Sequence, residues 1–150
     1  MAKKLRNLFK TDLPFYIIFI LAALAVPRVI IHDLHLADLN SAPYKALATV
    51  PYLIWFVVAV ARKSSTPLKD FLVVGGVFGG LLALTHQLLW DSAIKTANID
   101  MSITLDPSVE QIILRTAAVM SSVLTGLIIG GFFGCIAWVA NAIRRKLKRQ

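Results

Sequence analysis

The residues best suited to chemistry are three histidines that have carboxylates near them. His32 and His35 are three residues apart, and Asp38 follows them. If one helix continued through these positions, the three side chains would form a loose stripe that His86 could join from another helix. Imidazole and carboxylate groups together bind divalent metals. The sequence therefore contains a candidate metal site, and a pH-sensing role or a plain position at a membrane surface are the alternatives.

Two arginines lie in or beside apolar segments, where an unpaired charge is costly. Arg28 either extends to the outer headgroups or pairs with Asp91 or another acid on that side. Arg115 marks the outer edge of its own apolar segment. With His86, these are the ionisable side chains that we expect inside the membrane, and no carboxylate falls within a predicted hydrocarbon stretch. That lack argues against a proton-coupled transporter.

Glycines are spaced for close contact between two helices. In lipid, hydrophobic burial contributes little to helix association, so glycines four residues apart mainly let two backbones approach. This glycine-zipper spacing predicts either packing within one chain, or contact with a second copy or a larger partner. The glycines concerned are Gly75, Gly76, Gly79 and Gly80 in one segment and Gly126, Gly130 and Gly134 in another.

Sequence motifs of catalysis are missing. The chain has no nucleophile elbow, no P-loop and no pair of carboxylates suited to acid–base work in a cleft. Cys135 is the only cysteine, which excludes an intramolecular disulfide and a cysteine-based zinc site. We therefore expect that the chain is not an enzyme and carries no cofactor.

The elements that position these residues follow from composition. Of the 150 residues, 57% are apolar and 16% are charged, and the mean hydropathy is +0.72, which is unlike a water-soluble domain. A helix of about 20 residues crosses a bilayer. We predict an all-α integral membrane protein, a single membrane domain over residues 1–150. Its four-helix bundle covers residues 13–32, 43–61, 67–90 and 107–143.

Caps and prolines support these helix starts. A hydroxyl or carboxylate residue accepts hydrogen bonds from free amides at a helix start, and proline is tolerated in the first turn. Pro27 and Pro51 fall inside predicted helices and should kink them. The start signals are Thr11 and Asp12 with Pro14, Ser41 with Pro43, Thr66 with Pro67, and Asp106 with Pro107.

Charge predicts the orientation. Basic loops remain cytoplasmic, so both termini, the inner loop 62–66 and the basic tail 144–150 should face the cytoplasm, with outer loops at 33–42 and 91–106. We expect a plasma membrane location and attraction to anionic lipid at the inner face. Nucleic-acid binding is not expected, because no stacking aromatics accompany the tail. Twelve of the 16 basic residues lie on the inner side: Lys3, Lys4, Arg6, Lys10, Arg62, Lys63, Lys69, Arg144, Arg145, Lys146, Lys148 and Arg149.

The first apolar segment has a second interpretation. A basic start, an apolar stretch and the run Ala23–Leu24–Ala25 also resemble a signal peptide with its cleavage site. Cleavage would leave three helices. The apolar run resumes at Val29 and is longer than a typical signal core, so we expect a retained helix.

Three functions fit this sequence. We expect a non-catalytic accessory, scaffolding or oligomer-forming subunit that acts through glycine-mediated helix packing, as a homo-oligomer or beside a larger membrane protein. The alternative is a small channel or transporter whose path is lined by the third and fourth predicted helices, with Arg28 or Arg115 favouring anions. The third is an enzyme or metal-dependent factor that acts through the outer histidines.

Overall fold

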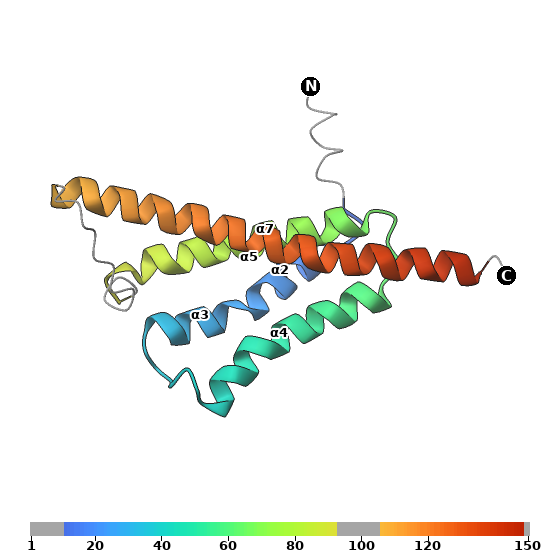
Figure 1. Ribbon diagram of the computed structural model, residues 1–150, viewed down its shortest axis with the longest axis horizontal. Coiled ribbons are helices and arrows are strands. Elements are labelled where there is room, and N and C mark those ends of the chain that lie inside the picture. The colour runs from blue at the N-terminus through green and yellow to red at the C-terminus, as the bar shows by residue number, and fades with distance from the viewer. Residues whose placement is uncertain (1–10, 93–105, 149–150) are drawn as a thin grey trace, which may run out of the picture.

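The structure, a computed structural model, describes residues 11–92 and 106–148 (Figure 1). Its helices long enough to cross a membrane confirm the predicted all-α class and the count of four within these ranges. The first ten residues and the loop 93–105 lie outside the described residues, together with the basic side chains and the loop predicted there. The helices are α2 (Phe15–Leu24), α3 (Val26–Asp33), α4 (Ala42–Ala61), α5 (Pro67–Leu88) and α7 (Pro107–Leu147).

Helices α5 and α7 form the main pair, and the other helices are placed around them. The long α7 runs along α5, α2 lies against α5, and α4 contacts α7 (Figure 1). The segments α2 and α3 together make one candidate span, residues 15–33. We call the end of the bundle where α3 and α5 end the His86 end. The opposite end, where α4 ends and α5 begins, is the Arg144 end.

An aromatic cluster fills the centre of the bundle. Trp55 of α4 is fully buried, and its ring lies 5.6 Å from the Phe133 ring of α7 and 5.9 Å from the Phe78 ring of α5, measured between centroids. Aromatic pairs at such distances and near-perpendicular angles are favourable beyond their burial. The cluster therefore joins α4, α5 and α7, while the outward faces carry exposed side chains such as Phe15 and Leu53.

Two of the four predicted caps are present. The side chain of Ser41 accepts a hydrogen bond from the backbone N–H of Tyr44 at 3.4 Å, and Asp106 accepts one from Ser108 at 2.9 Å. These contacts fix the starts of α4 and α7, as the sequence predicted.

The other two predicted caps are wrong. Asp12 accepts hydrogen bonds from the loop residue Ser65 instead of capping α2, which begins after Pro14 without a side-chain cap. The Thr66 hydroxyl turns toward the Asp70 carboxylate at 3.2 Å. Each side chain therefore bonds to another partner: Asp12 to a residue far away in the sequence, and Thr66 to a residue one helical turn later.

The first predicted helix is broken near Pro27. Proline has no backbone N–H to donate, and the chain leaves the regular helix at Ala25, whose N–H donates to Ala22 O at 3.4 Å. The predicted kink is confirmed here. At Pro51 the helix is not interrupted, since α4 continues through it from Ala42 to Ala61.

The last helix is longer than expected and absorbs most of the basic tail. We predicted its end at residue 143, but α7 continues to Leu147. Residues 144–147 contain no glycine or proline, and cations are favourable in a last helical turn. Arg144 and Arg145 therefore occupy defined positions on a helix.

Candidate functional site

Helices α5 and α7 are in backbone contact at their glycines. A Cβ atom on Gly75 would meet the carbonyl oxygen of Gly126, and one on Gly130 would meet the carbonyl oxygen of Phe71. Overlap with backbone atoms cannot be relieved by a side-chain rotation. Hydrogen is therefore the only side chain that fits at these positions without separating the helices.

The other predicted glycines divide into two groups. Gly79 and Gly134 belong to the contact, since a Cβ on either would lie 2.9 Å from an atom of the facing helix. Gly76 does not belong, because its Cβ would meet only a side-chain carbon at 3.8 Å, and a Cβ on Gly80 would meet open space. The glycine contact is thus one stripe on each helix.

This contact lies within one chain. It corresponds to the alternative in which the two glycine-rich segments pack on each other, and the glycines of the stripe are not displayed to a second copy. With the backbones touching, no space remains between α5 and α7 at this level. A path that ran directly between these two helices would have no room along the glycine contact.

Arg115 holds α5 and α7 together at the His86 end. Its Nη1 donates to Gln87 Oε1 at 3.2 Å, and Gln87 Nε2 donates to the carbonyl oxygen of Arg115 at 3.3 Å. The guanidinium also lies 4.8 Å from the centre of the Trp90 ring, a cation–π distance. The Arg115 guanidinium therefore has its partners within this chain, Gln87 and Trp90, at the His86 end.

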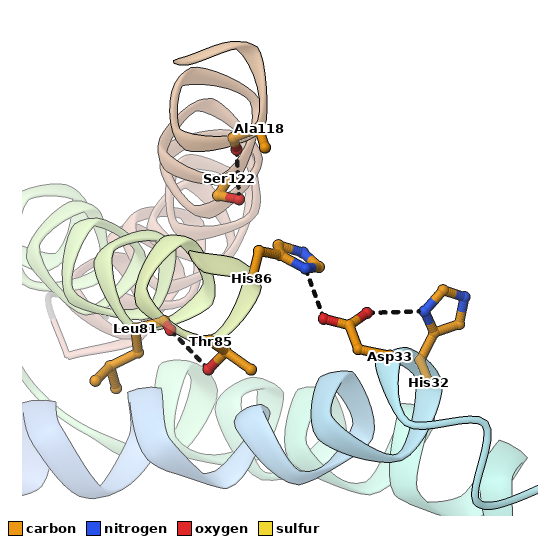
Figure 2. A network of polar contacts seen from close by, with 7 residues as sticks. All are labelled: His32, Asp33, Leu81, Thr85, His86, Ala118 and Ser122. Carbon is orange, nitrogen blue, oxygen red and sulfur yellow. Dashed lines mark hydrogen bonds and ion pairs between the residues drawn. The ribbon is translucent and has the colours of Figure 1, made fainter. Parts of the chain in front are cut away.

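Asp33 is the centre of a polar network at the His86 end (Figure 2). Its side chain is only 2% exposed. His86 Nδ1 lies 2.7 Å from Asp33 Oδ2, and His32 Nδ1 lies 3.1 Å from Asp33 Oδ1. Because Asp33 ends α3 and His86 belongs to α5, the shorter contact joins two helices.

Hydroxyl groups near this network are bonded to their own helices. Thr85 Oγ1 donates to Leu81 O at 2.9 Å, and Ser122 Oγ donates to Ala118 O at 2.7 Å (Figure 2). Such bonds satisfy a hydroxyl in apolar surroundings. These two groups support the helices and do not extend the histidine network.

The end of α3 prevents the predicted histidine stripe. His35 has a φ of 53°, its N–H donates to His32 O at 3.2 Å, and the N–H of Leu36 donates to Ile31 O at 3.0 Å. This pair of bonds is a Schellman motif, in which a left-handed residue stops the helix. His35 therefore leaves the helical direction three residues after His32.

The metal hypothesis is not supported by this arrangement. Asp38 accepts a hydrogen bond from Asn40 N in the loop, away from any helical stripe. Among the residues that the structure describes, no group of three His, Cys, Asp or Glu side chains is placed to hold a metal ion. The stripe of His32, His35 and Asp38 required the helix to continue outward, and it does not form because α3 ends at Asp33.

Arg28 is half-buried on α3. Its polar neighbours are the hydroxyl groups of Tyr44 and Tyr52. Within residues 11–92 and 106–148, both ion pairs belong to Asp33, and neither includes Arg28. The alternative in which Arg28 pairs with Asp91 or another acid of that side is therefore not observed, and the guanidinium keeps its charge without a carboxylate from the described chain.

A cavity of about 240 Å³ lies beside Arg28 and receives side chains from all four spans. Its wall brings the Arg28 guanidinium, two imidazoles and the Tyr52 phenol together with apolar side chains. Its depth reaches the aromatic cluster, since Phe78 also lines it. The lining residues are Arg28, Val29, His32, Tyr52, Phe78, Leu82, His86, Thr125 and Ile129.

An apolar hollow continues from this cavity. It measures about 390 Å³ and shares Tyr52 and Ile129 with the cavity, so the two are neighbours. Its other lining residues are Ile128, Phe132 and Phe133, all from α7. Together the two spaces form a groove with a cationic part near the His86 end and a purely apolar part toward the middle of α7. We call this the lateral groove.

A second polar cluster lies at the Arg144 end. Asp70 is 1% exposed and accepts hydrogen bonds from Asp12 N at 2.9 Å and Ser64 Oγ at 2.6 Å. Hydrogen bonds from the Ser65 side chain and backbone lower the pKa of the Asp12 carboxyl from its ordinary value of 3.8. The cluster ties the start of the first span to the connection between α4 and α5.

Several of these residues could not be found from sequence. The sequence places Asp33 only at the start of the predicted outer loop 33–42, because its burial between two histidines depends on where α5 passes. Tyr52 and Asp70 carried no local signal at all. Pro27 is the one sequence signal that bears on this site, because it predicts a break in the first span, and the break changes the direction of the helix that carries Arg28 and His32.

Comparisons with known proteins give no match: no family model, curated protein or solved structure is similar to this chain.

Proposed function

We propose that this chain is a multi-pass protein of the plasma membrane that binds one single-chain anionic amphiphile, of the long-chain carboxylate type, in the lateral groove. Four candidate spans and exposed apolar side chains on their outward faces support insertion in lipid. The observation that carries the binding proposal is the cationic cavity joined to an apolar hollow through Tyr52 and Ile129.

Arg28 supplies the charge that such a ligand needs. A guanidinium in an apolar setting is stabilised by an anion that accepts its hydrogen bonds. Asp33, the carboxylate at the same end of the bundle, does not pair with Arg28, because its two oxygens contact the His32 and His86 imidazoles. A ligand carboxylate beside Arg28 would therefore complete a charge pair that the chain itself leaves open.

The hollow accounts for the other half of the ligand. Its walls are aliphatic and aromatic, with no polar surface, and it faces outward along α7. A free small anion would leave this space without a partner, whereas an acyl chain would fill it and enter from the lipid. The groove therefore suits an amphiphile better than an ion or a polar solute.

Native mass spectrometry of the full chain in mild detergent tests this proposal. We expect the chain to retain oleate at about one molecule per chain and to retain oleyl alcohol, which has the same tail without the charge, much less. Arg28→Gln should weaken oleate binding roughly tenfold, the effect of losing one charge-assisted contact. The control Lys45→Gln removes an exposed cation at the same end and should change binding less than twofold.

Equal retention of oleate and oleyl alcohol, or equal loss in both variants, would contradict the proposal. A variant with a blocked hollow, Ile128→Trp, provides an independent check, because residue 128 is exposed on α7 and a larger side chain there should exclude the tail without disturbing the charge.

The orientation proposed for this protein has both termini in the cytoplasm, so that the His86 end faces outward. The basic residues of the 62–66 connection and of the α7 C-terminus support it. Reporter fusions at each terminus should both indicate the cytoplasm. Opposite locations for the two reporters would refute this topology and leave the binding proposal to be judged separately.

A further inference from the structure

A cavity of about 170 Å³ at the Arg144 end is separate from the lateral groove. Four of its six lining side chains are cationic, and none is acidic. They come from the C-terminal part of α7 and from the connection between α4 and α5. The lining residues are Lys63, Ser64, Asn141, Arg144, Arg145 and Lys148.

The α7 residues of this cavity share one helical face. Asn141, Arg144, Arg145 and Lys148 are spaced i, i+3, i+4 and i+7, which places them on one side of a helix. Arg144 is also held in position, since its Nη1 donates to Arg62 O at 3.2 Å. The cationic wall is therefore part of the fold, and its arrangement does not depend on a free tail.

Asn141 gives the second, independent sign of a ligand. It is 6% exposed, and its buried Nδ2 has no hydrogen-bond partner. Buried polar atoms in native structures are nearly always bonded, because an unbonded one costs about 1–3 kcal/mol. An acceptor in the adjoining cavity would satisfy this amide.

The acids near this cavity are already occupied. Asp70 accepts from Ser64 Oγ and from Asp12 N, and the Asp12 carboxylate accepts from Ser65. Neither acid forms an ion pair with a cavity cation among the described residues, where ion pairs involve Asp33. The cavity cations thus have no direct carboxylate partner in the described part of the chain, although Asp12 and Asp70 keep their own charge.

We infer that this cavity binds a phosphoryl group. Several cations and one neutral amide donor match a group that carries negative charge on several acceptor oxygens. The group could be the phosphodiester of an anionic phospholipid or free phosphate, since both present this chemistry. The inference goes beyond the amphiphile proposal, because it concerns the opposite end of the bundle and other residues.

The test measures two ligands on the purified full chain. One arm counts phosphatidylglycerol retained by native mass spectrometry, with phosphatidylcholine as the neutral reference. The other arm titrates inorganic phosphate and follows the ³¹P resonance. Binding in the first arm alone identifies a lipid headgroup as the source, binding in the second identifies free phosphate, and either result supports a phosphoryl site.

Variants show whether the binding is local. Asn141→Leu keeps the size of a buried side chain and removes its amide. Arg145→Gln removes a cation of the cavity at an exposed position, where the substitution should not disturb the fold. We expect each to weaken binding roughly tenfold. The matched control is Lys146→Gln, on the same helical turn but outside the cavity, and it should change binding less than twofold.

Two results would overturn the inference. Absence of binding in both arms would do so, and so would a loss in Lys146→Gln as large as in Arg145→Gln, because that would reflect general charge attraction. Arg145→Gln keeps the test decisive if Asn141→Leu fails to fold. Arg28→Gln should leave both arms unchanged, which separates this site from the lateral groove.

Discussion

Trp55 Nε1 donates a hydrogen bond to the backbone carbonyl oxygen of Leu21 at 2.9 Å, inside the bundle. The bond falls where the first span is broken: Ala25, the regular donor to that carbonyl, donates to Ala22 O instead. A tryptophan from α4 thus satisfies a carbonyl that the break near Pro27 leaves free. The first span is therefore tied to the core by its backbone as well as by its side chains.

Replacing Trp55 by phenylalanine should destabilise the protein strongly. The change removes a buried hydrogen bond and leaves a cavity beside Phe78 and Phe133, for a combined cost of about 2–4 kcal/mol. Thermal unfolding in mild detergent measures it. The exposed Trp138 gives the matched control, and Trp138→Phe should shift the melting temperature little. Equal shifts in the two variants would show that the Leu21 bond contributes nothing.

Gly130→Ala should destabilise the single chain, because the added carbon meets the backbone of α5. Overpacking of this kind costs about 1–3 kcal/mol. Gly80→Ala is the control: its carbon meets open space, and alanine is favoured over glycine in a helix by about 1 kcal/mol. Unfolding of both variants, together with their size in detergent, distinguishes intrachain packing from assembly. A change in size without a change in stability would contradict the intrachain contact.

His86→Gln should lower stability more than His32→Gln. His86 contacts Asp33 across two helices at 2.7 Å, whereas His32 is its sequence neighbour at 3.1 Å with a side chain 41% exposed. Loss of the interhelical contact leaves a buried carboxylate with fewer donors, at a cost of roughly 1–3 kcal/mol. Melting temperatures in detergent decide between them, and a larger effect of His32→Gln would show that Asp33 depends on its neighbour instead.

Acid should weaken the Arg144 end through Asp12. Its folded pKa is lowered by the hydrogen bonds from Ser65, so these bonds stabilise the folded state at pH values above the ordinary 3.8. The contribution is lost as pH falls through the lowered folded value. Asp12→Asn should therefore melt at a lower temperature than the unmodified chain near neutral pH, and the difference should shrink below about pH 4. A difference independent of pH would exclude the carboxylate as its cause.

The sequence determined the elements of this protein because the signals that make them are local. Runs of apolar residues predict four spans, and Ser41 and Asp106 cap the helices that follow them. Pro27 predicts the break in the first span, since a missing N–H acts on its own helix. The glycine spacing likewise predicts which face of α5 can approach another backbone.

Only the tertiary structure decided which faces meet. A glycine stripe is equally suited to a helix of its own chain or of another, and the structure directs it to α7 within the chain. The pairing of Asp33 with His86 and the unbonded amide of Asn141 depend on how separate helices pass one another. Periodicity along one helix carries no information about a neighbour's position, because that position is set by packing of the whole bundle.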